Sequence, residues 1–127
     1  MNKMEITTKE HNGVSVAIIK SDELLIVDAQ SALDLIATVR YETKCDCVAI
    51  FKNSITEDFF VLSKGLAGDV LQKFVNYGIK LAIIGDFSGY TSKPLQDFIY
   101  ESNRGNSIFF VDTEESAMER LAGAADR

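Results

Sequence analysis

The chain has no tryptophan, one proline, one histidine and two cysteines among its 127 residues. A structural zinc site takes four Cys or His ligands at recognisable spacing, whereas Cys45 and Cys47 form a lone pair with His11 far away in sequence. A Ser-His-Asp or Cys-His catalytic set needs a well-placed histidine, and His11 falls in a predicted hairpin turn. We therefore expect no metal site, no cofactor and reduced cysteines at the edge of a strand.

Basic charge is also scarce, because 13 Lys and Arg residues stand against 19 Asp and Glu residues, a net charge of -6. A basic excess drives binding to nucleic acid and to anionic lipid surfaces, so both kinds of partner are disfavoured. The first residues, MNKMEITTKEHNG, lack the apolar core of a signal peptide, and no run approaches the roughly eighteen apolar residues that span a bilayer. These absences predict a cytoplasmic protein that binds neither nucleic acid nor membrane.

The composition that remains is that of an ordinary globular protein, with 46% hydrophobic and 25% charged residues. The length suits one domain over residues 1–127, with frayed ends at 1–3 and 123–127. No linker, repeat or low-complexity segment interrupts it, so we expect a single hydrophobic core.

The first third of the chain predicts a hairpin, a short strand and a helix. Residues 4–20 predict the hairpin, because Asn12-Gly13 is the preferred pair for a tight turn with positive φ at both positions. The apolar run LLIV at 24–27 predicts another short strand. Asp28 can cap a helix whose inner positions are Ala32, Leu33, Ile36, Ala37 and Tyr41.

From there on, strands predicted at 47–51, 79–84 and 107–111 alternate with helices. The second helix is expected to open at Ser63 and to end at Gly78, with an inner stripe of Leu66, Ala67, Val70, Leu71, Phe74 and Val75. The third helix starts near Ser92, with Pro94 in its first turn. Asp112 and Glu115 resemble a capping box for the last helix, whose inner residues are Ala117, Met118 and Leu121.

This order predicts an α/β fold with a single-layer mixed sheet. Its N-terminal strands are antiparallel, and the β-α-β-α-β-α alternation that follows implies parallel strands joined by right-handed crossovers. In the segment between residues 52 and 62, Phe59 and Phe60 are expected to close the core under a loop rather than to form a surface for a partner.

Two stretches carry a resemblance to a known family. The sequence GLAGDVLQKFVNYGIKLAIIGDF, followed by YTSKPLQDFIYESNRGNSIFF, is similar to the bacterial family of domains of unknown function 4180 over nearly the whole chain. The activity of that family is not established, so the resemblance implies membership and no reaction.

The element order also resembles, more distantly, the STAS domains of sulfate transporters and anti-sigma-factor antagonists. Their signature Asp-Ser-Ser-Gly-Leu lies at the start of the second helix, where this chain reads Leu62-Ser63-Lys64-Gly65-Leu66. Ser63, Gly65 and Leu66 match, but Lys64 stands where STAS domains carry a phosphorylatable serine. The resemblance implies a protein-interaction surface at Ser63 to Leu66, but Lys64 cannot carry the phosphoserine of the usual STAS switch.

Further candidates gather where the parallel strands end, since ligands of open α/β sheets collect at the carboxyl edge. After the strand at 79–84 come the four candidates Asp86, Ser88, Ser92 and Lys93. Gly85, Gly89 and Lys93 are spaced wrongly for a Walker phosphate loop. We interpret Gly85 as allowing the strand to end beside a helix, Gly89 as a turn residue, and Thr91 or Ser92 as a helix cap, in preference to a ligand site.

Three hypotheses about function follow. The first is a non-catalytic regulatory or protein-interaction module that works through Ser63 to Leu66 and the neighbouring 86–93 loop. The alternative is a sensor that binds a small molecule or anion through helix N-termini, Ser88, Ser92 and Lys93. The third is an enzyme that uses Asp86 and Asp112, which end adjacent strands if the strands at 79–84 and 107–111 are neighbours. A homodimer is a further expectation.

Overall fold

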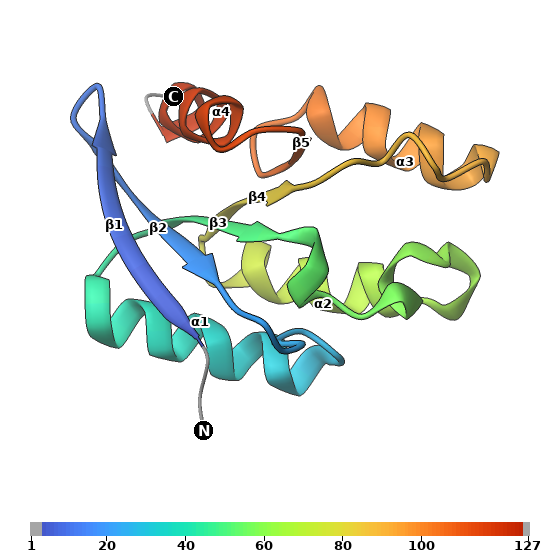
Figure 1. Ribbon diagram of the computed structural model, residues 1–127, viewed down its shortest axis with the longest axis horizontal. Helices are drawn as coiled ribbons and strands as arrows, with labels where there is room; N and C mark the ends of the chain where they lie inside the picture. The colour runs from blue at the N-terminus through green and yellow to red at the C-terminus, as the bar shows by residue number, and fades with distance from the viewer. Residues whose placement is uncertain (1–3, 126–127) are drawn as a thin grey trace.

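The computed structural model describes residues 4–125 (Figure 1). Within this range the strands are β1 (Glu5–His11), β2 (Val14–Lys20), β3 (Cys47–Phe51), β4 (Lys80–Ile84) and β5 (Ile108–Val111). The helices are α1 (Ala29–Thr43), α2 (Leu66–Asn76), α3 (Lys93–Asn103) and α4 (Glu114–Ala125). Three short 3-10 helices between β3 and α2 are η1 (Lys52–Ser54), η2 (Glu57–Phe60) and η3 (Leu62–Lys64).

The strands of this range form one mixed sheet in the order β1-β2-β3-β4-β5. β1 and β2 are antiparallel, and every later pair is parallel. The expected α/β fold with antiparallel strands at the N-terminus and β-α alternation after them is confirmed. Because β3, β4 and β5 run parallel to one another, all three end at the same edge of the sheet.

The β1–β2 hairpin turns at Asn12 and Gly13, as predicted. Both residues have positive φ, 52° and 82°, which is the geometry of a type I′ turn. His11 does not lie in the turn itself, because it is the last residue of β1 and pairs with Val14.

The prediction of a strand at 24–27 is wrong. Only Ile26 makes a bridge, to Ile55, and the amides of Leu25 and Ile26 both donate to the Ser54 carbonyl, at 2.7 and 3.1 Å. Ile26 is fully buried, whereas Leu24 and Val27 are 53% and 44% exposed. An apolar run forms a strand only where a neighbouring strand offers a ladder of partners, and here a single buried residue anchors a loop.

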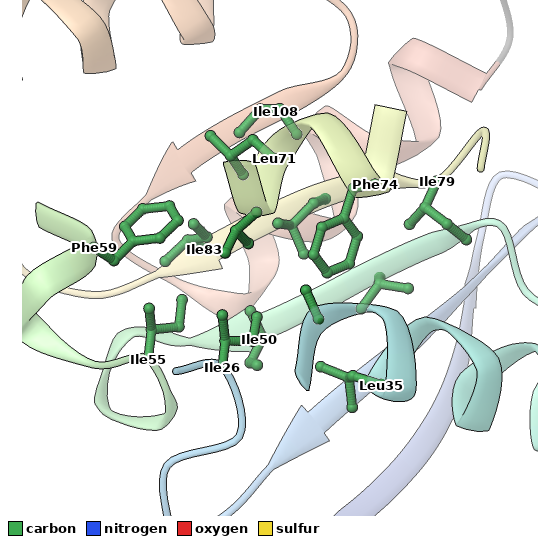
Figure 2. Close-up of a cluster of buried hydrophobic side chains, with 14 of the residues drawn as sticks. Ile26, Leu35, Ile50, Ile55, Phe59, Leu71, Phe74, Ile79, Ile83 and Ile108 are labelled. Carbon is green, nitrogen blue, oxygen red and sulfur yellow. The ribbon is translucent and has the colours of Figure 1, made fainter. Parts of the chain in front are cut away.

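Helices cover the two faces of the sheet unequally. The larger buried cluster joins one face to α1, α2 and α3, and Figure 2 shows Ile26 and Ile55 within it beside the strand residues Ile50 and Ile83. The smaller cluster joins the other face to α4, with Ala117, Met118 and Leu121 at the contact, as predicted. Figure 1 shows α1 and α2 on one side of the strands and the red α4 on the other.

Helix α1 begins after Asp28, as predicted, but turns a different face to the core. The Asp28 carboxylate accepts from the Ser31 amide at 2.8 Å. Ala32 and Ile36 are buried as predicted, together with Leu35 and Val39. Of the other predicted inner residues, Leu33 is partly buried, Ala37 is exposed and Tyr41 is 81% exposed. Two apolar stripes with helical spacing overlap in this segment, and the position of the sheet selects between them.

Two other predicted helix boundaries and one predicted inner residue need correction. Helix α2 starts at Leu66, because Ser63 and Lys64 belong to η3 and Gly65 turns the chain with φ of 78°. Val75, expected inside, is 46% exposed. The cap of α4 is Thr113, whose hydroxyl accepts from the Ser116 amide at 3.0 Å, and the Asp112 with Glu115 capping box was a wrong prediction.

The remaining boundaries follow the sequence. Gly78 has a φ of 71° just beyond α2, and Ser92 caps α3 with Pro94 in its first turn. Fraying was predicted from residue 123, but α4 continues to Ala125. The predicted fraying at 1–3 and 126–127 concerns residues outside the described range. No helix between residues 4 and 125 has the length and apolar character needed to cross a membrane.

Candidate functional site

The carboxyl edge of the sheet carries the candidate site. η1 and η2 follow β3, the loop from Gly85 to Ser92 follows β4, and Asp112 follows β5. Since these strands are parallel neighbours, the three connections converge at one end of the molecule.

The Lys52 side chain runs across Gly85, which determines how this edge is built. A Cβ placed on Gly85 would stand 2.6 Å from the Lys52 Cβ and 3.0 Å from its Cδ. Glycine is therefore needed at position 85 for close approach, and the neighbour that requires it is a lysine stem, not the helix we predicted. The stem directs the Lys52 Nζ over the rings of Phe60 and Tyr90, at 5.4 and 5.0 Å from their centroids.

Glu57 completes this cluster. Its Oε1 lies 3.0 Å from the Lys52 Nζ, and the Tyr90 hydroxyl donates to the carboxylate with both oxygens at 2.9 Å. The Tyr90 ring stacks on Phe60 with centroids 5.1 Å apart and an interplanar angle of 20°. Lys52, Glu57, Phe60 and Tyr90 thus tie the β4–α3 loop to the segment after β3, and we call them the edge cluster.

The environment sets the charge of each group in the edge cluster. The Tyr90 hydroxyl, with help from Glu57, raises the pKa of the Lys52 ammonium. Burial alone would raise the pKa of Glu57, but hydrogen bonds from Lys52 and Tyr90 lower it below its ordinary 4.5. Burial, helped by Glu57, raises the pKa of the Tyr90 hydroxyl. At neutral pH the cluster is therefore an ion pair with a neutral tyrosine donor.

Beside the edge cluster lies a groove of about 550 Å³, which we call the 60–90 groove. Six of its lining residues are apolar or aromatic: Phe60, Val61, Leu62, Tyr90, Pro94 and Leu95. Glu57 and Asp58 contribute carboxylates to the lining, and Ser63, Thr91 and Ser92 contribute hydroxyls. Val61 is 45% exposed although it is a large apolar residue.

A second hollow, of about 730 Å³, lies between the ends of β3 to β5 and helix α4. Asp86 and Asp112 both line it, together with Glu119 and Arg120. Both aspartates are exposed, and the hollow is open to solvent. Asp86 accepts from the Ser88 hydroxyl at 2.6 Å and from the Ser88 amide at 2.9 Å, which lowers the pKa of its carboxyl.

The predicted site residues divide between these places. Ser63 and Ser92 line the 60–90 groove, and Asp86 with its partner Ser88 lies by the second hollow. Lys64 pairs with Asp58 at 3.0 Å, and Lys93 pairs with Asp97 at 2.9 Å. Gly65 serves as the N-cap of α2, and Leu66 packs partly buried against the core.

Lys52, Glu57 and Tyr90 were not among the candidate residues that the sequence predicted. A signal was present, because Gly85 directly after a buried strand marks a close approach. The approaching residue, 33 positions earlier, could not be read from the pattern. The expectation that Phe59 and Phe60 close the core is confirmed, since they are 1% and 3% exposed.

Both cysteines are free and buried, Cys45 before β3 and Cys47 within it. Burial raises the pKa of the Cys47 thiol, so it is poorly suited to nucleophilic or metal chemistry. Across residues 4–125 no group of three or more His, Cys, Asp or Glu side chains is arranged to hold a metal ion.

Comparison with known protein families places the chain. No curated protein matches the chain significantly. A family model described as a domain of unknown function, DUF4180, matches residues 11–121, which span β2 to β5, the edge cluster and most of α4. The chain therefore belongs to the DUF4180 family.

Proposed function

We propose that this domain is a non-catalytic protein-interaction module whose binding surface is the 60–90 groove. The observation that carries the proposal is an apolar groove at the carboxyl edge, with Val61 left 45% exposed on its wall. A groove of about 550 Å³ can take one or two large side chains of a partner. The edge cluster supports this role, because it holds the two walls at a defined separation before a partner arrives.

The rim of the groove suggests the chemistry of the partner. Glu57 and Asp58 are largely exposed, with side chains 68% and 59% accessible, although each also pairs with a lysine. A chain with net charge -6 attracts basic segments over a longer range. We therefore propose a partner segment in which a large apolar residue stands next to Lys or Arg.

The anion sensor is less well supported. Three lysines at this edge, Lys52, Lys64 and Lys93, are paired with Glu57, Asp58 and Asp97. An incoming phosphate would have to displace carboxylates and would meet their negative charge. An enzyme using Asp86 and Asp112 has weaker support still, because general acid catalysis calls for a raised pKa and that of Asp86 is lowered.

The regulatory part of the proposal rests on the resemblance of the element order to STAS domains. Ser63 is exposed on the rim of the groove, so a phosphate there would add negative charge beside a partner. We also propose a cytoplasmic location, since two free, buried cysteines fit a reducing compartment.

The test is selection of peptides from a random library on the immobilised domain, followed by affinity measurement with purified variants. Val61→Ser removes an apolar wall of the groove, and Val75→Ser is the matched control, because these valines are 45% and 46% exposed. We expect selected peptides that combine apolar and basic residues and bind the Val61→Ser variant about tenfold more weakly, which is about 1.4 kcal/mol.

Two results would contradict the proposal. One is a selection that enriches no sequence above background, and the other is equal loss of binding with Val61→Ser and Val75→Ser. A thermal-shift screen with phosphate and nucleotides separates the alternative, because specific stabilisation by one of them would favour the sensor.

A further inference from the structure

The two edge strands of the sheet differ in how their outward backbone groups are protected from pairing with another strand. At the β5 edge, the Asn103 side chain from α3 takes the place of a neighbouring strand. Its Oδ1 accepts from the Phe110 amide at 2.7 Å, and its Nδ2 donates to the Phe110 carbonyl at 3.1 Å. β5 is also only four residues long. Short length and occupied backbone groups are ways in which proteins prevent pairing at an edge.

The β1 edge has no such protection within residues 4–125. β1 is seven residues long and pairs with β2 without a bulge, from Glu5 opposite Lys20 to His11 opposite Val14. It contains no proline. Figure 1 shows this blue strand along the outer side of the sheet, and β2 is its pairing partner in the described strand order.

The hairpin turn determines which backbone groups face outward. In a two-residue hairpin the pair that closes the turn is hydrogen-bonded, so His11 and Val14 bond to each other. Pairs along an antiparallel ladder alternate, so Lys9, Thr7 and Glu5 also point their backbone groups at β2. Ile6, Thr8 and Glu10 therefore present their N–H and C=O groups away from the sheet.

We propose that a second copy of this chain pairs along the β1 edge, antiparallel, with a two-fold axis at Thr8. In this register Thr8 faces Thr8 of the other copy, and Ile6 faces Glu10 in both directions. All three outward residues then form hydrogen-bonded pairs, and the two sheets become one continuous sheet. The interface is independent of the proposed peptide groove, which lies at the carboxyl edge.

Charges along β1 are compatible with this register. Glu5 comes opposite His11 of the second copy, and Lys9 lies diagonally from both Glu5 and Lys9 of the second copy on the same face. No two like charges stand directly opposite. Lysine on an edge strand usually discourages pairing, but the Lys9 Nζ is engaged with Glu114 of its own α4. Opposite charges across strands favour pairing.

Sedimentation equilibrium over a wide concentration range tests the proposal. Because one strand pair makes a small interface, we expect a dissociation constant in the micromolar range or weaker. Thr8→Pro removes an outward N–H without breaking the β2 ladder and should abolish the dimer. Thr8→Ala keeps that N–H and should leave the dimer largely intact.

A second variant covers the case in which Thr8→Pro does not fold. Thr8→Lys sets two ammonium groups against each other at the two-fold axis, so the dimer should weaken at low salt and recover at high salt. Ser15→Lys adds the same charge on β2, one strand in from the edge, and should have little effect. A wild-type chain that stays monomeric at millimolar concentration, or a dimer indifferent to both Thr8→Pro and Thr8→Lys, would overturn the proposal.

Discussion

Lys52 and Gly85, at the ends of the neighbouring strands β3 and β4, are in contact so close that position 85 has no room for a side chain. A Cβ there would stand 2.6 Å from the Lys52 Cβ. This contact orients the lysine toward Glu57, Phe60 and Tyr90, and so one glycine supports the whole edge cluster.

We expect Gly85→Ala to destabilise the protein by about 1–3 kcal/mol, because the added methyl overlaps a Cβ that cannot move without the backbone. Gly68→Ala is the control. Gly68 lies in α2 with nothing within 4 Å of a built Cβ, so alanine there should stabilise by about 0.5–1 kcal/mol. Urea unfolding measures both, and a stabilising Gly85→Ala would contradict the close contact.

Tyr90→Phe keeps the ring on Phe60 but removes the hydroxyl that donates to Glu57. We expect a loss of about 0.5–1.5 kcal/mol of unfolding free energy, since the hydrogen bond is only partly shielded from solvent. Tyr100→Phe, on a side chain that is 62% exposed, serves as the control and should change stability by less than about 0.5 kcal/mol. Equal effects of the two variants would mean that the Tyr90–Glu57 bond contributes nothing.

Acid should weaken the protein partly through Glu57. Its pKa is lower folded than unfolded, so the folded state favours the carboxylate, and the stabilisation is present above the ordinary value of 4.5 and lost as pH falls through the folded pKa. The Glu57 side chain is 68% exposed, so solvent screening limits the effect to a few tenths of a kcal/mol up to about 1. Urea midpoints measured from pH 6 to pH 3 should fall less steeply in Glu57→Gln and in Lys52→Met than in the wild type. If the urea midpoints of both variants fell with pH as steeply as those of the wild type, Glu57 would not contribute to the acid sensitivity.

The cysteines should be unreactive in the native protein. Cys45 and Cys47 are 4% and 3% exposed, and burial raises the pKa of the Cys47 thiol above 9.0. A thiol reagent at pH 8 should therefore label the native protein far more slowly than the unfolded protein. In the unfolded protein both thiols should react at once, which is two equivalents of reagent per chain. Rapid labelling of the folded chain would show that the region around the start of β3, where both cysteines lie, opens readily to solvent.

We expect the Asn103 side chain to contribute more to the free energy of unfolding than a residue at the end of a helix usually does. Asn103→Ala leaves the Phe110 N–H and C=O without their partner, and we expect a loss of about 1–3 kcal/mol in urea unfolding. Asn76→Ala, at the end of α2, is the control, because the Asn76 side chain accepts only an exposed bond from Gln72. If Asn103→Ala lowered the unfolding free energy no more than Asn76→Ala, the hydrogen bonds of Asn103 to the Phe110 backbone would not be needed for stability.

Local signals in the sequence were sufficient to predict turns and helix boundaries where short-range sterics or capping decides the backbone conformation. Asn12-Gly13 predicts the hairpin, Asp28 and Ser92 predict helix starts, and Gly78 predicts a helix end, all of which are observed. Each depends on residues within a few positions of one another. The alternation of strands and helices predicted the α/β fold for the same reason.

Predictions failed where contacts with a segment far away in the chain decide the local structure or the buried face of a helix. LLIV at 24–27 is as apolar as a strand, but only Ile26 finds a partner, Ile55, so a loop results. In α1 two apolar stripes compete, and the sheet buries Leu35 and Val39 instead of Ala37 and Tyr41. In α4 the neighbouring polar residues Asp112 and Thr113 could both cap, and the chain direction out of β5 selects Thr113.

By itself, the sequence determined the N-terminal hairpin, the alternation of helices and strands after Asp28 and the class of fold, because periodicity and capping are local properties. Only the tertiary structure decided which side chains meet at the carboxyl edge of the sheet. Lys52, Glu57 and Tyr90 come from three connections, and their meeting depends on the parallel order of β3 and β4 and on the absence of a side chain at Gly85. Contacts between segments so far apart in the chain are fixed by packing, which no local pattern encodes.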